Sequence, residues 1–176
     1  IVQRYLEQDN RIHLLPSNGK NIGARRNFSQ LMEQVADAYT MFCDQDDIWL
    51  PEKLTLCAIE MNRIESESKG NTPCLVHTDL YVMDINANLI NPSFVNYENL
   101  RPTRATHEPL LSVNVATGCT MLVNIPLLKL ALPIPEEAIV HDWWCAIISG
   151  VGRRQFLPLA TIGYRQHQSN QIGARN

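Results

Sequence analysis

The sequence predicts a single α/β domain, built on a mixed, mainly parallel sheet with flanking helices. Two observations favour this class. In the first half of the chain, short apolar runs typical of buried strands alternate with segments of helical periodicity. The later strands are shorter, which indicates mixed pairing at one edge of the sheet. The 176 residues have the length of about one domain, and we assign residues 1–176 to it.

The first part of the chain is predicted to contain a helix end, a strand and a second helix. Residues 1–10 have the pattern of the last part of an amphipathic helix. Residues 11–16 form a short apolar strand, which the turn sequence Ser17-Asn18-Gly19 closes. The helix over residues 24–36 follows from apolar side chains at positions i, i+3, i+4 and i+7, namely Phe28, Leu31, Met32 and Val35.

The centre of the chain predicts a strand, a helix and a longer strand. Residues 39–43 have the apolar character of a buried strand. Pro51 suits the first turn of a helix, which ends near Ser66 and whose buried side holds Leu54, Cys57, Ala58, Met61 and Ile64. After a polar loop, a strand is expected over residues 74–83, with a hairpin-like turn over residues 84–91.

The last part of the chain predicts shorter elements. Residues 91–109 are irregular and rich in Asn, Pro and Arg. Beyond them we expect a short helix over 110–115, a strand over 119–124, a helical turn from Pro126, a helix over 140–149 that ends at Gly150, and a terminal pair of strands over 154–157 and 160–165.

The predicted sheet lacks a beginning. A nucleotide-binding α/β sheet normally starts with a β-α-β unit, whereas this chain opens within a helix. We therefore expect about one strand and most of a helix to precede Ile1 in the natural protein.

Composition and charge exclude several classes of protein. The formal net charge is -3, and the lysine and arginine residues do not form a basic stripe, so nucleic acid is not expected as a partner. No apolar run is long enough to span a bilayer, so any membrane contact is expected to be peripheral. The five cysteines are an odd number without a C-x-x-C motif, which predicts small core residues rather than a disulfide framework or a zinc site. A reducing, cytoplasmic location follows, with contact at most to the inner face of the plasma membrane.

The most informative segment is the acidic cluster of Asp44, Asp46 and Asp47. It lies between the end of a predicted strand and the helix start at Pro51. Like charges this close raise one another's pKa unless a cation lies among them. Their place at the end of a strand therefore predicts a hard divalent metal, with a phosphate on its other side. The alternative is an acidic turn that caps the next helix.

Four segments, taken in order, resemble the motifs of one enzyme family. Asp44-Gln45-Asp46 is similar to the DxD motif of GT-A fold glycosyltransferases, and its continuation to Leu54 resembles family 2 members, particularly bacterial rhamnosyl- and galactosyltransferases. The segment Asn21-x-Gly23-x-x-Arg26-Asn27-Phe28 resembles the family's loop before the DxD strand. The segment His141-Asp142-Trp143-Trp144 resembles the one that supplies the acceptor-side base, and Tyr164-Arg165-Gln166-His167-x-x-Asn170 resembles the C-terminal signature. Together these segments cover nearly the whole chain and imply a GT-A-like domain without its first β-α elements.

On the donor side, the resemblance implies a nucleotide sugar and a divalent metal, Mn²⁺ or Mg²⁺, held by Asp44 and Asp46, with Asp44 close to the phosphates. Such an ion would offset the charge of the departing nucleoside diphosphate, and all-oxygen ligands suit either metal. Arg26 is expected to pair with a phosphate, or else to be a solvated helix charge. Asn21 and Gly23 are expected to bring backbone amides to the nucleotide, or else to form an ordinary turn.

On the acceptor side, Asp142 is the expected catalytic base of an inverting transfer, in which the acceptor hydroxyl displaces the diphosphate from the opposite side. Its place at a helix start predicts a lowered pKa and an ionised carboxylate; the alternative is a helix N-cap. Trp143 and Trp144 are candidates for stacking on a sugar, although at least one is expected in the core. Gly118 would permit close approach of the acceptor sugar, or form a plain turn.

Three further polar residues have less specific roles. His167 would reach the metal or a phosphate, as the resemblance implies, or be an ordinary hydrogen-bonded histidine. His77 and Asp79 would help to shape the donor pocket, and Asp79 is equally suited to be a structural hydrogen-bond acceptor.

The sequence therefore predicts a metal-dependent, inverting glycosyltransferase of bacterial surface polysaccharide synthesis. Its partners would be a nucleotide-sugar donor and a saccharide or lipid-linked saccharide acceptor. Two alternatives stay open. Another metal-dependent enzyme of phosphate esters, such as a nucleotidyltransferase or phosphohydrolase, would also explain the acidic cluster. A sugar-binding module would bind saccharide without catalysis and without the metal.

Overall fold

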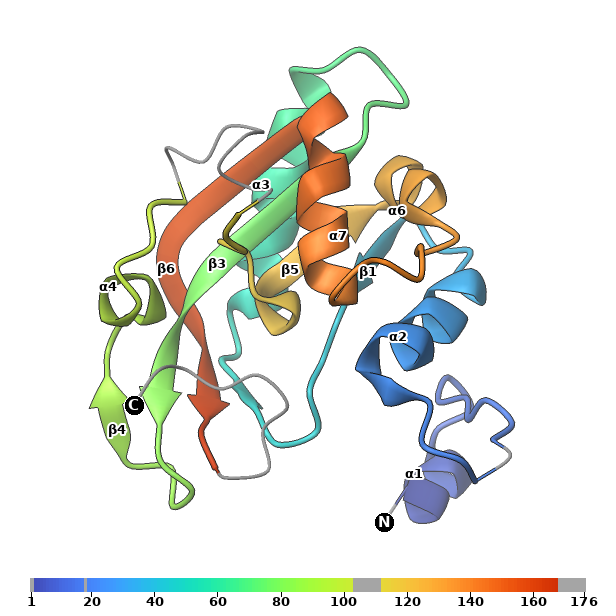
Figure 1. Cartoon of the computed structure of the whole chain (residues 1–176), viewed down its shortest axis with the longest axis vertical. Helices are drawn as coiled ribbons and strands as arrows, with labels where there is room; N and C mark the ends of the chain where they lie inside the picture. The colour runs from blue at the N-terminus through green and yellow to red at the C-terminus, as the bar shows by residue number, and fades with distance from the viewer. Residues whose placement is uncertain (1, 18, 103–111, 168–176) are drawn as a thin grey trace.

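The computed structural model describes residues 2–17, 19–102 and 112–167. Within them, one curled, mixed sheet has helices on both faces (Figure 1). The strands are β1 (Tyr39–Met41), β2 (Ile48–Trp49), β3 (Cys74–Met83), β4 (Leu89–Asn91), β5 (Met121–Asn124) and β6 (Arg153–Arg165). The helices are α1 (Val2–Gln8), α2 (Gly23–Glu33), α3 (Lys53–Ser66), α4 (Phe94–Tyr97), α6 (Ile125–Ala131) and α7 (His141–Ile148), with the short 3₁₀ helices η1 (Gly118–Thr120) and η2 (Ser149–Val151).

The order of strands across the sheet is β1-β5-β3-β6-β2, and β4 pairs with the end of β3. Among the described ladders only β3–β6 is parallel, and the other four are antiparallel. The mixed sheet is therefore confirmed, but the expectation of a mainly parallel sheet is wrong. The reason is visible in β5, which is buried at every position. A strand buried on both faces has the same sequence pattern whichever way it runs.

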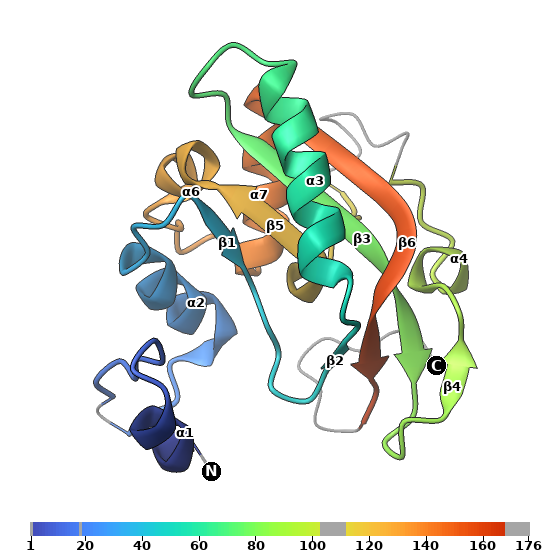
Figure 2. The ribbon, with the colours of Figure 1, turned by 180° about the vertical axis from the view of Figure 1, so that it is seen from behind.

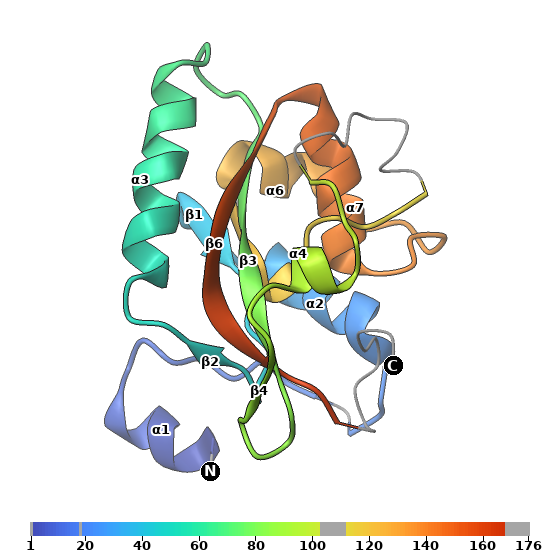
Figure 3. The same ribbon diagram turned by 90° about the vertical axis from the view of Figure 1, so that its left-hand side faces the viewer.

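The sheet is the middle of three layers (Figure 3). Helix α3 covers one face, which is turned to the viewer in Figure 2, and α2, α6 and α7 lie on the other face. Successive side chains of β3 point to opposite faces, so the strand supplies both layers of the core. Cys74 and Val76 pack with the buried side of α3, whereas Leu75 packs with α6 and α7.

The two strands predicted at the end of the chain are one continuous strand, β6. Its register with β3 passes from Leu157 directly to Ala160, which leaves Pro158 and its neighbour as a bulge. Proline has no N–H to donate to a ladder. The sequence pattern therefore indicated a break at the point where the structure has a bulge.

Two other predicted elements differ from the structure. Residues 11–16 are not a strand: Ile12 and Leu14 are 39% and 65% exposed, and the segment pairs with none of the described strands. Of the helix expected from residue 110 on, residues 110–111 lie outside the described residues and residues 112–115 are not helical. Strand β2 was not predicted, because it has two residues and depends on pairing with β6. Helix α4 lies within residues 91–109, which were expected to be irregular.

The remaining predicted helices and strands are confirmed, with slightly different ends. On α3, however, Leu54 was expected on the buried side and is 58% exposed. Asn124 shows how four of these elements are joined. Its Oδ1 accepts hydrogen bonds from the backbone N–H of Cys74 (2.8 Å) and from that of Leu127 (3.2 Å), and its Nδ2 donates to Glu65 (2.7 Å). One buried amide therefore caps α6 and ties β5 to β3 and α3.

All five cysteines are free thiols, and four of them are buried. Cys43 is exposed, so the expectation of a core residue is wrong for it, because it follows the end of β1 and opens the acidic turn. In the part of the chain that the structure describes, no helix has the length and apolar character needed to cross a membrane.

Candidate functional site

A cavity of about 1210 Å³ opens beside the acidic turn. Its walls come from α2 and the loop before it, the turn itself, η1, the start of α7 and the end of β6. The fold brings these distant segments to one place. Eight of the ten residues predicted for the site line the cavity: Asn21, Gly23, Asp44, Asp46, Gly118, Asp142, Trp143 and His167.

Two of the three carboxylates of the acidic turn, those of Asp44 and Asp46, line the cavity and are half-buried. Burial raises the pKa of Asp44, and the charge of Asp46 raises it further. Oδ2 of Asp46 lies 2.6 Å from Nε2 of His167, which follows the end of β6. Two residues predicted as metal ligands from opposite parts of the chain are therefore in direct contact.

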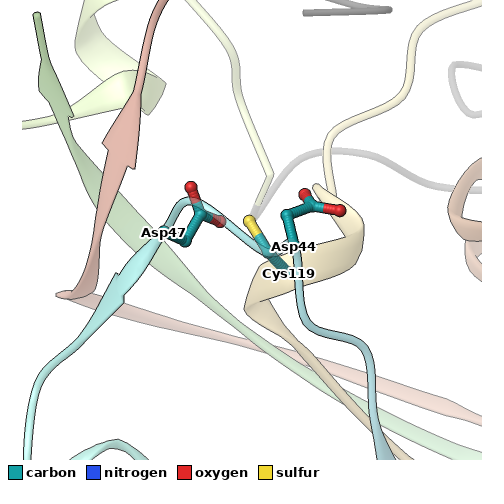
Figure 4. Close-up of side chains that lie close together, drawn as sticks. All are labelled: Asp44, Asp47 and Cys119. Carbon is teal, nitrogen blue, oxygen red and sulfur yellow. The ribbon is translucent and has the colours of Figure 1, made fainter. Parts of the chain in front are cut away.

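The third carboxylate, that of Asp47, is absent from the cavity lining. Its Oδ1 accepts a hydrogen bond from the backbone N–H of Arg165 (3.4 Å), and the Cys119 thiol is a second partner. Its Oδ2 is buried without a hydrogen-bond partner, and burial raises the pKa of Asp47 to about 6. Figure 4 shows Asp44 and Asp47 on either side of the Cys119 sulfur, and one ligand atom from each of the three lies within 4.8 Å of the others.

Among the described residues, the ligand atoms that lie close enough together to hold an ion are those of Asp44, Asp47 and Cys119; Asp44, Asp46 and His167 do not form such a group. The predicted set with Asp46 and His167 provides carboxylate oxygens and an imidazole nitrogen, which suit Mn²⁺, while the carboxylates alone also suit Mg²⁺. The set with Asp47 and Cys119 adds sulfur, which suits softer metals. Burial raises the pKa of the Cys119 thiol well above its usual value, which disfavours the thiolate that binds a metal. The donor atoms of Asp44, Asp46 and His167 therefore suit a hard divalent ion better in kind, whereas those of Asp44, Asp47 and Cys119 are the ones that lie together in this structure.

The acidic turn does not cap the next helix. Strand β2 separates the turn from α3, and the N-cap residue of α3 is Glu52. The turn is held instead by Arg165, whose Nε donates to the backbone carbonyl of Asp46 (3.2 Å) and whose Nη1 donates to that of Ile85 (2.5 Å). Arg165 thereby connects the end of β6, the acidic turn and the hairpin between β3 and β4.

Asp142, the predicted base, lies in the first turn of α7. Its Oδ2 accepts a hydrogen bond from the N–H of Gly118 (2.8 Å), and its Oδ1 accepts one from the N–H of Trp143 (2.6 Å). The N-cap residue of α7 is Val140, so Asp142 is not the cap. Burial raises the pKa of Asp142 to about 6, against the effect of these hydrogen bonds. The expectation of a lowered pKa is wrong, because desolvation outweighs the helix N-terminus.

Gly118 allows η1 and the start of α7 to come close together. A Cβ at this position would lie 3.1 Å from Nε2 of His141 and 3.2 Å from Cβ of Asp142. The backbone N–H of Gly118 can therefore reach the carboxylate of Asp142. This is more than the plain turn considered from the sequence, while contact of Gly118 with an acceptor sugar stays a prediction.

His141 lines the cavity, and the sequence did not single it out for a role of its own. Its ring stacks on Phe28, with centroids 3.7 Å apart, and meets Phe42 edge-on at 4.9 Å. The residue is 7% exposed, and neither ring nitrogen has a hydrogen-bond partner. Burial lowers the pKa of His141 to about 4, so the ring is neutral at pH 7. It acts as an aromatic packing residue, and only its position beside Asp142 in the motif could have drawn attention to it.

Two predicted site residues lie outside the cavity lining. Arg26 forms an exposed ion pair with Glu136 (2.8 Å), which agrees with the alternative of a solvated helix charge. Trp144 donates its indole N–H to the carbonyl of Ala131 (2.8 Å) and packs on the core. Trp144 confirms the expectation that at least one of the two tryptophans packs on the core. Trp143 lines the cavity instead.

The loop before α2 forms another wall of the cavity. Oδ1 of Asn21 accepts a hydrogen bond from the N–H of Gly23 (2.9 Å), and Gly23 has a φ of 78°, which favours glycine. This is the ordinary turn that the sequence left open as an alternative. Lys20 supplies the single lysine or arginine charge among the described lining residues, against three carboxylates. A diphosphate would therefore need additional positive charge to bind here.

Asp79 and His77 are not cavity residues. Asp79 accepts hydrogen bonds from the hydroxyl of Ser93 (2.5 Å) and the N–H of Val95 (3.1 Å). It is thus the structural acceptor, and it fixes α4, whose Phe94 lines the cavity. His77 is a buried core residue, and burial lowers its pKa to about 3.

No family model matches the chain. The chain is similar to a protein of Shigella flexneri named dTDP-rhamnosyl transferase RfbG, with 27% identity over 177 residues. The similarity covers 93% of this chain and 56% of that protein, so the chain spans about half of its relative's length. The fold and site define an α/β protein with an anionic cavity, and the similarity supports a relationship with glycosyltransferases.

Proposed function

We propose that this chain is a catalytic domain of a metal-dependent, inverting glycosyltransferase of family 2, with the GT-A fold. The observation that carries the proposal is that Asp44, Asp46 and Asp142 line one cavity although they come from distant parts of the chain. The similarity to dTDP-rhamnosyl transferase RfbG supports it and makes dTDP-rhamnose the first donor to test. The acceptor is a saccharide or lipid-linked saccharide of bacterial surface polysaccharide, used at the cytoplasmic face of the membrane.

Asp44 and Asp46, with His167, are the residues that would hold Mn²⁺ or Mg²⁺. When bound, the ion supplies positive charge that stabilises the departing diphosphate. Support comes from the charge of the cavity, in which three carboxylates face a single lysine among the described lining residues. Lys20 adds its ammonium on the donor side. Arg26 is left out of this role, because it pairs with Glu136.

Asp142 takes the proton of the acceptor hydroxyl. The N–H groups of Gly118 and Trp143 hold its two oxygens, so the carboxylate is oriented before the acceptor arrives. The acceptor oxygen forms a bond to the anomeric carbon while the bond from that carbon to the diphosphate oxygen breaks. The proton passes to Asp142, and the electron pair leaves with the nucleoside diphosphate. Because attack is opposite to the leaving group, the configuration inverts.

The two tryptophans have separate duties in this proposal. Trp143 offers a ring at the cavity on which an acceptor sugar can stack. Trp144 anchors α7 through its bond to Ala131, so the helix start that carries Asp142 keeps its position.

The decisive experiment measures the melting temperature with dTDP and dTDP-rhamnose, with Mn²⁺ or Mg²⁺ and with EDTA. We expect the nucleotide to raise the melting temperature by about 5–10 °C at a hundredfold excess over Kd, and only when the metal is present. Asp46→Asn should lose this shift. Glu136→Gln, which alters an exposed carboxylate outside the cavity, should keep it. A nucleotide shift that survives in EDTA would contradict the metal's role.

Turnover separates the proposal from the two competing readings. A glycosyltransferase releases dTDP from dTDP-rhamnose faster than it turns over a nucleoside triphosphate, whereas a nucleotidyltransferase or phosphohydrolase shows the reverse. A sugar-binding module binds free saccharide in EDTA and releases no dTDP.

A further inference from the structure

Three rings from separate elements contact one another at the cavity, and we call them the aromatic cluster. Phe28 belongs to α2, Phe42 directly follows β1, and His141 is the first residue of α7. The rings of Phe28 and His141 are stacked, with centroids 3.7 Å apart and an angle of 16° between their planes. Phe42 meets both edge-on, at 5.7 Å from Phe28 and 4.9 Å from His141. All three residues line the cavity.

The aromatic cluster lies between the two parts of the proposed site. One residue separates Phe42 from Asp44, and His141 directly precedes Asp142. Phe42 is 4% exposed and His141 is 7% exposed, so both rings are enclosed by their neighbours. Because side chains in a close-packed interior have little room to shift, contact between these rings fixes the separation of the acidic turn and the start of α7.

His141 contributes its ring rather than its nitrogens. Both nitrogens are buried without a hydrogen-bond partner, so they offer no contact to a substrate. A neutral imidazole can stack on Phe28 without the cost of removing a charge from water. The Nε2 edge of the ring packs on Gly118, where a Cβ would lie 3.1 Å from this atom. The ring therefore supports the backbone group that donates its N–H to Asp142.

We propose that Phe28, Phe42 and His141 are positioning residues, which together set the place of the Asp142 carboxylate relative to the acidic turn. Phe28 is the support of the cluster, because it packs on the core from α2 and covers the face of the His141 ring. Without this ring, the start of α7 can shift away from η1. The role of Asp142 as a base rests on the proposed function, whereas the position of its carboxylate does not.

Hydrogen exchange at the backbone N–H of Gly118, followed by NMR, tests the positioning. This N–H donates to Oδ2 of Asp142 (2.8 Å), so its exchange rate reports whether the carboxylate keeps its place. Phe28→Leu keeps an apolar side chain but removes the stacked ring, and it should speed this exchange by about tenfold. Phe28→Tyr keeps the ring and should remain within about threefold of the wild type.

Met32→Ala is the matched control for the exchange experiment. Met32 is buried on the same helix but does not line the cavity, so its loss should lower the melting temperature and leave the local exchange at Gly118 unchanged. If Phe28→Leu does not fold, His141→Leu takes its place and should give the same acceleration. Unchanged exchange in a folded variant that lacks one ring, or an equal acceleration in Met32→Ala, would overturn the proposal.

The rate of dTDP release tests the consequence for the reaction. Phe28→Leu and His141→Leu should each lower kcat by about 10–100-fold, because a displaced catalytic group is costly, while KM for dTDP-rhamnose changes by less than about threefold. The double variant should lose no more than the larger single loss, since both rings act through the place of Asp142. A raised KM with kcat unchanged would make Phe28 a substrate contact, and losses that multiply would make the two rings independent; either result overturns the proposal. A wild type that releases no dTDP would contradict the proposed function, while exchange at Gly118 still decides the positioning.

Discussion

The two faces of the sheet are covered in different ways. On one face the single helix α3 lies along the strands (Figure 2), and Cys57, Met61 and Ile64 close a core of buried apolar side chains. On the other face α2, α6 and α7 share the cover, and the start of α7 lines a cavity with the carboxylate of Asp142. The side chains along the middle of a helix cover the apolar face of a sheet, whereas the first turn of a helix and the end of a strand expose polar groups. The cavity-side residues are therefore expected to govern chemistry, and the α3-side residues to govern stability.

The largest effect is expected for Asp142→Asn. Removal of the proposed general base should lower the release of dTDP from dTDP-rhamnose by about 10²–10⁴-fold. The amide keeps the size of the side chain and an oxygen that can accept from Gly118, so the melting temperature and the Mn²⁺-dependent binding of dTDP should change little. Loss of nucleotide binding would show that Asp142 belongs to the donor side and would break the division proposed here.

Met61→Ala is the matching change on the α3 face. Met61 is fully buried in the cluster between α3 and the sheet. The cavity left by its side chain should lower the free energy of unfolding by about 2–5 kcal/mol in urea titrations. Turnover of dTDP-rhamnose at a temperature well below the melting point should remain within about twofold of the wild type, because additivity holds for distant sites. A large loss of turnover in the folded variant would mean that the two faces are coupled.

Local patterns predicted most of the elements but not how the strands pair. The positions of β3 and α2 were predicted, but burial follows the expected period only in part: β3 is buried at nearly every position, and Leu31 on the predicted apolar face of α2 is 41% exposed. Neither the direction of β5 nor the existence of β2 depends on local pattern. Both follow from which strand lies beside them, which only the folded chain determines.

Site features that depend on neighbouring residues in the sequence were predicted, whereas those that depend on burial in the folded protein were not. The spacing of Asp44 and Asp46 marks an acidic turn in any structure. The pKa of Asp142 could not be anticipated, because its helix position predicts a decrease and its desolvation produces an increase. Lys53 has the sequence context of a solvated helix start, yet it is fully buried. Burial of this kind results from the packing of β2 and α3 against β6.

Gly118→Ala tests how closely the cavity side depends on backbone fit. The new methyl group would lie 3.1 Å from Nε2 of His141 and 3.2 Å from Cβ of Asp142, so η1 and α7 must separate slightly. We expect the rate of dTDP release to fall by about 10–100-fold, since small displacements of a catalytic group are costly. KM for dTDP-rhamnose should change little, because the donor side is untouched. Gly70→Ala is the control, since its Cβ would meet nothing within 4 Å. A variant that alters KM and spares the rate would contradict this role.

The smallest effect is the dependence of kcat/KM on pH, which is also the most specific test of the role of Asp142. Burial raises the pKa of Asp142 to about 6, so below that pH the base is protonated and kcat/KM should fall by about tenfold per pH unit. The folded state holds this proton more tightly than the unfolded chain, whose aspartate has a pKa near 3.8. The contribution of Asp142 to stability is therefore fully present below about pH 4 and lost as the pH rises through 6. His141 acts in the opposite sense: burial lowers its pKa from 6.5 to about 4, so its stabilisation is present above 6.5 and lost as the pH falls through 4. The melting temperature must accordingly be measured at each pH to separate the two effects.

Asp47→Asn is the control, because the pKa of Asp47 is also raised to about 6 but its side chain does not line the cavity. An acid limb that remains near pH 6 in this variant identifies Asp142 as its source, and a limb near pH 4 would show that the active carboxylate is solvated.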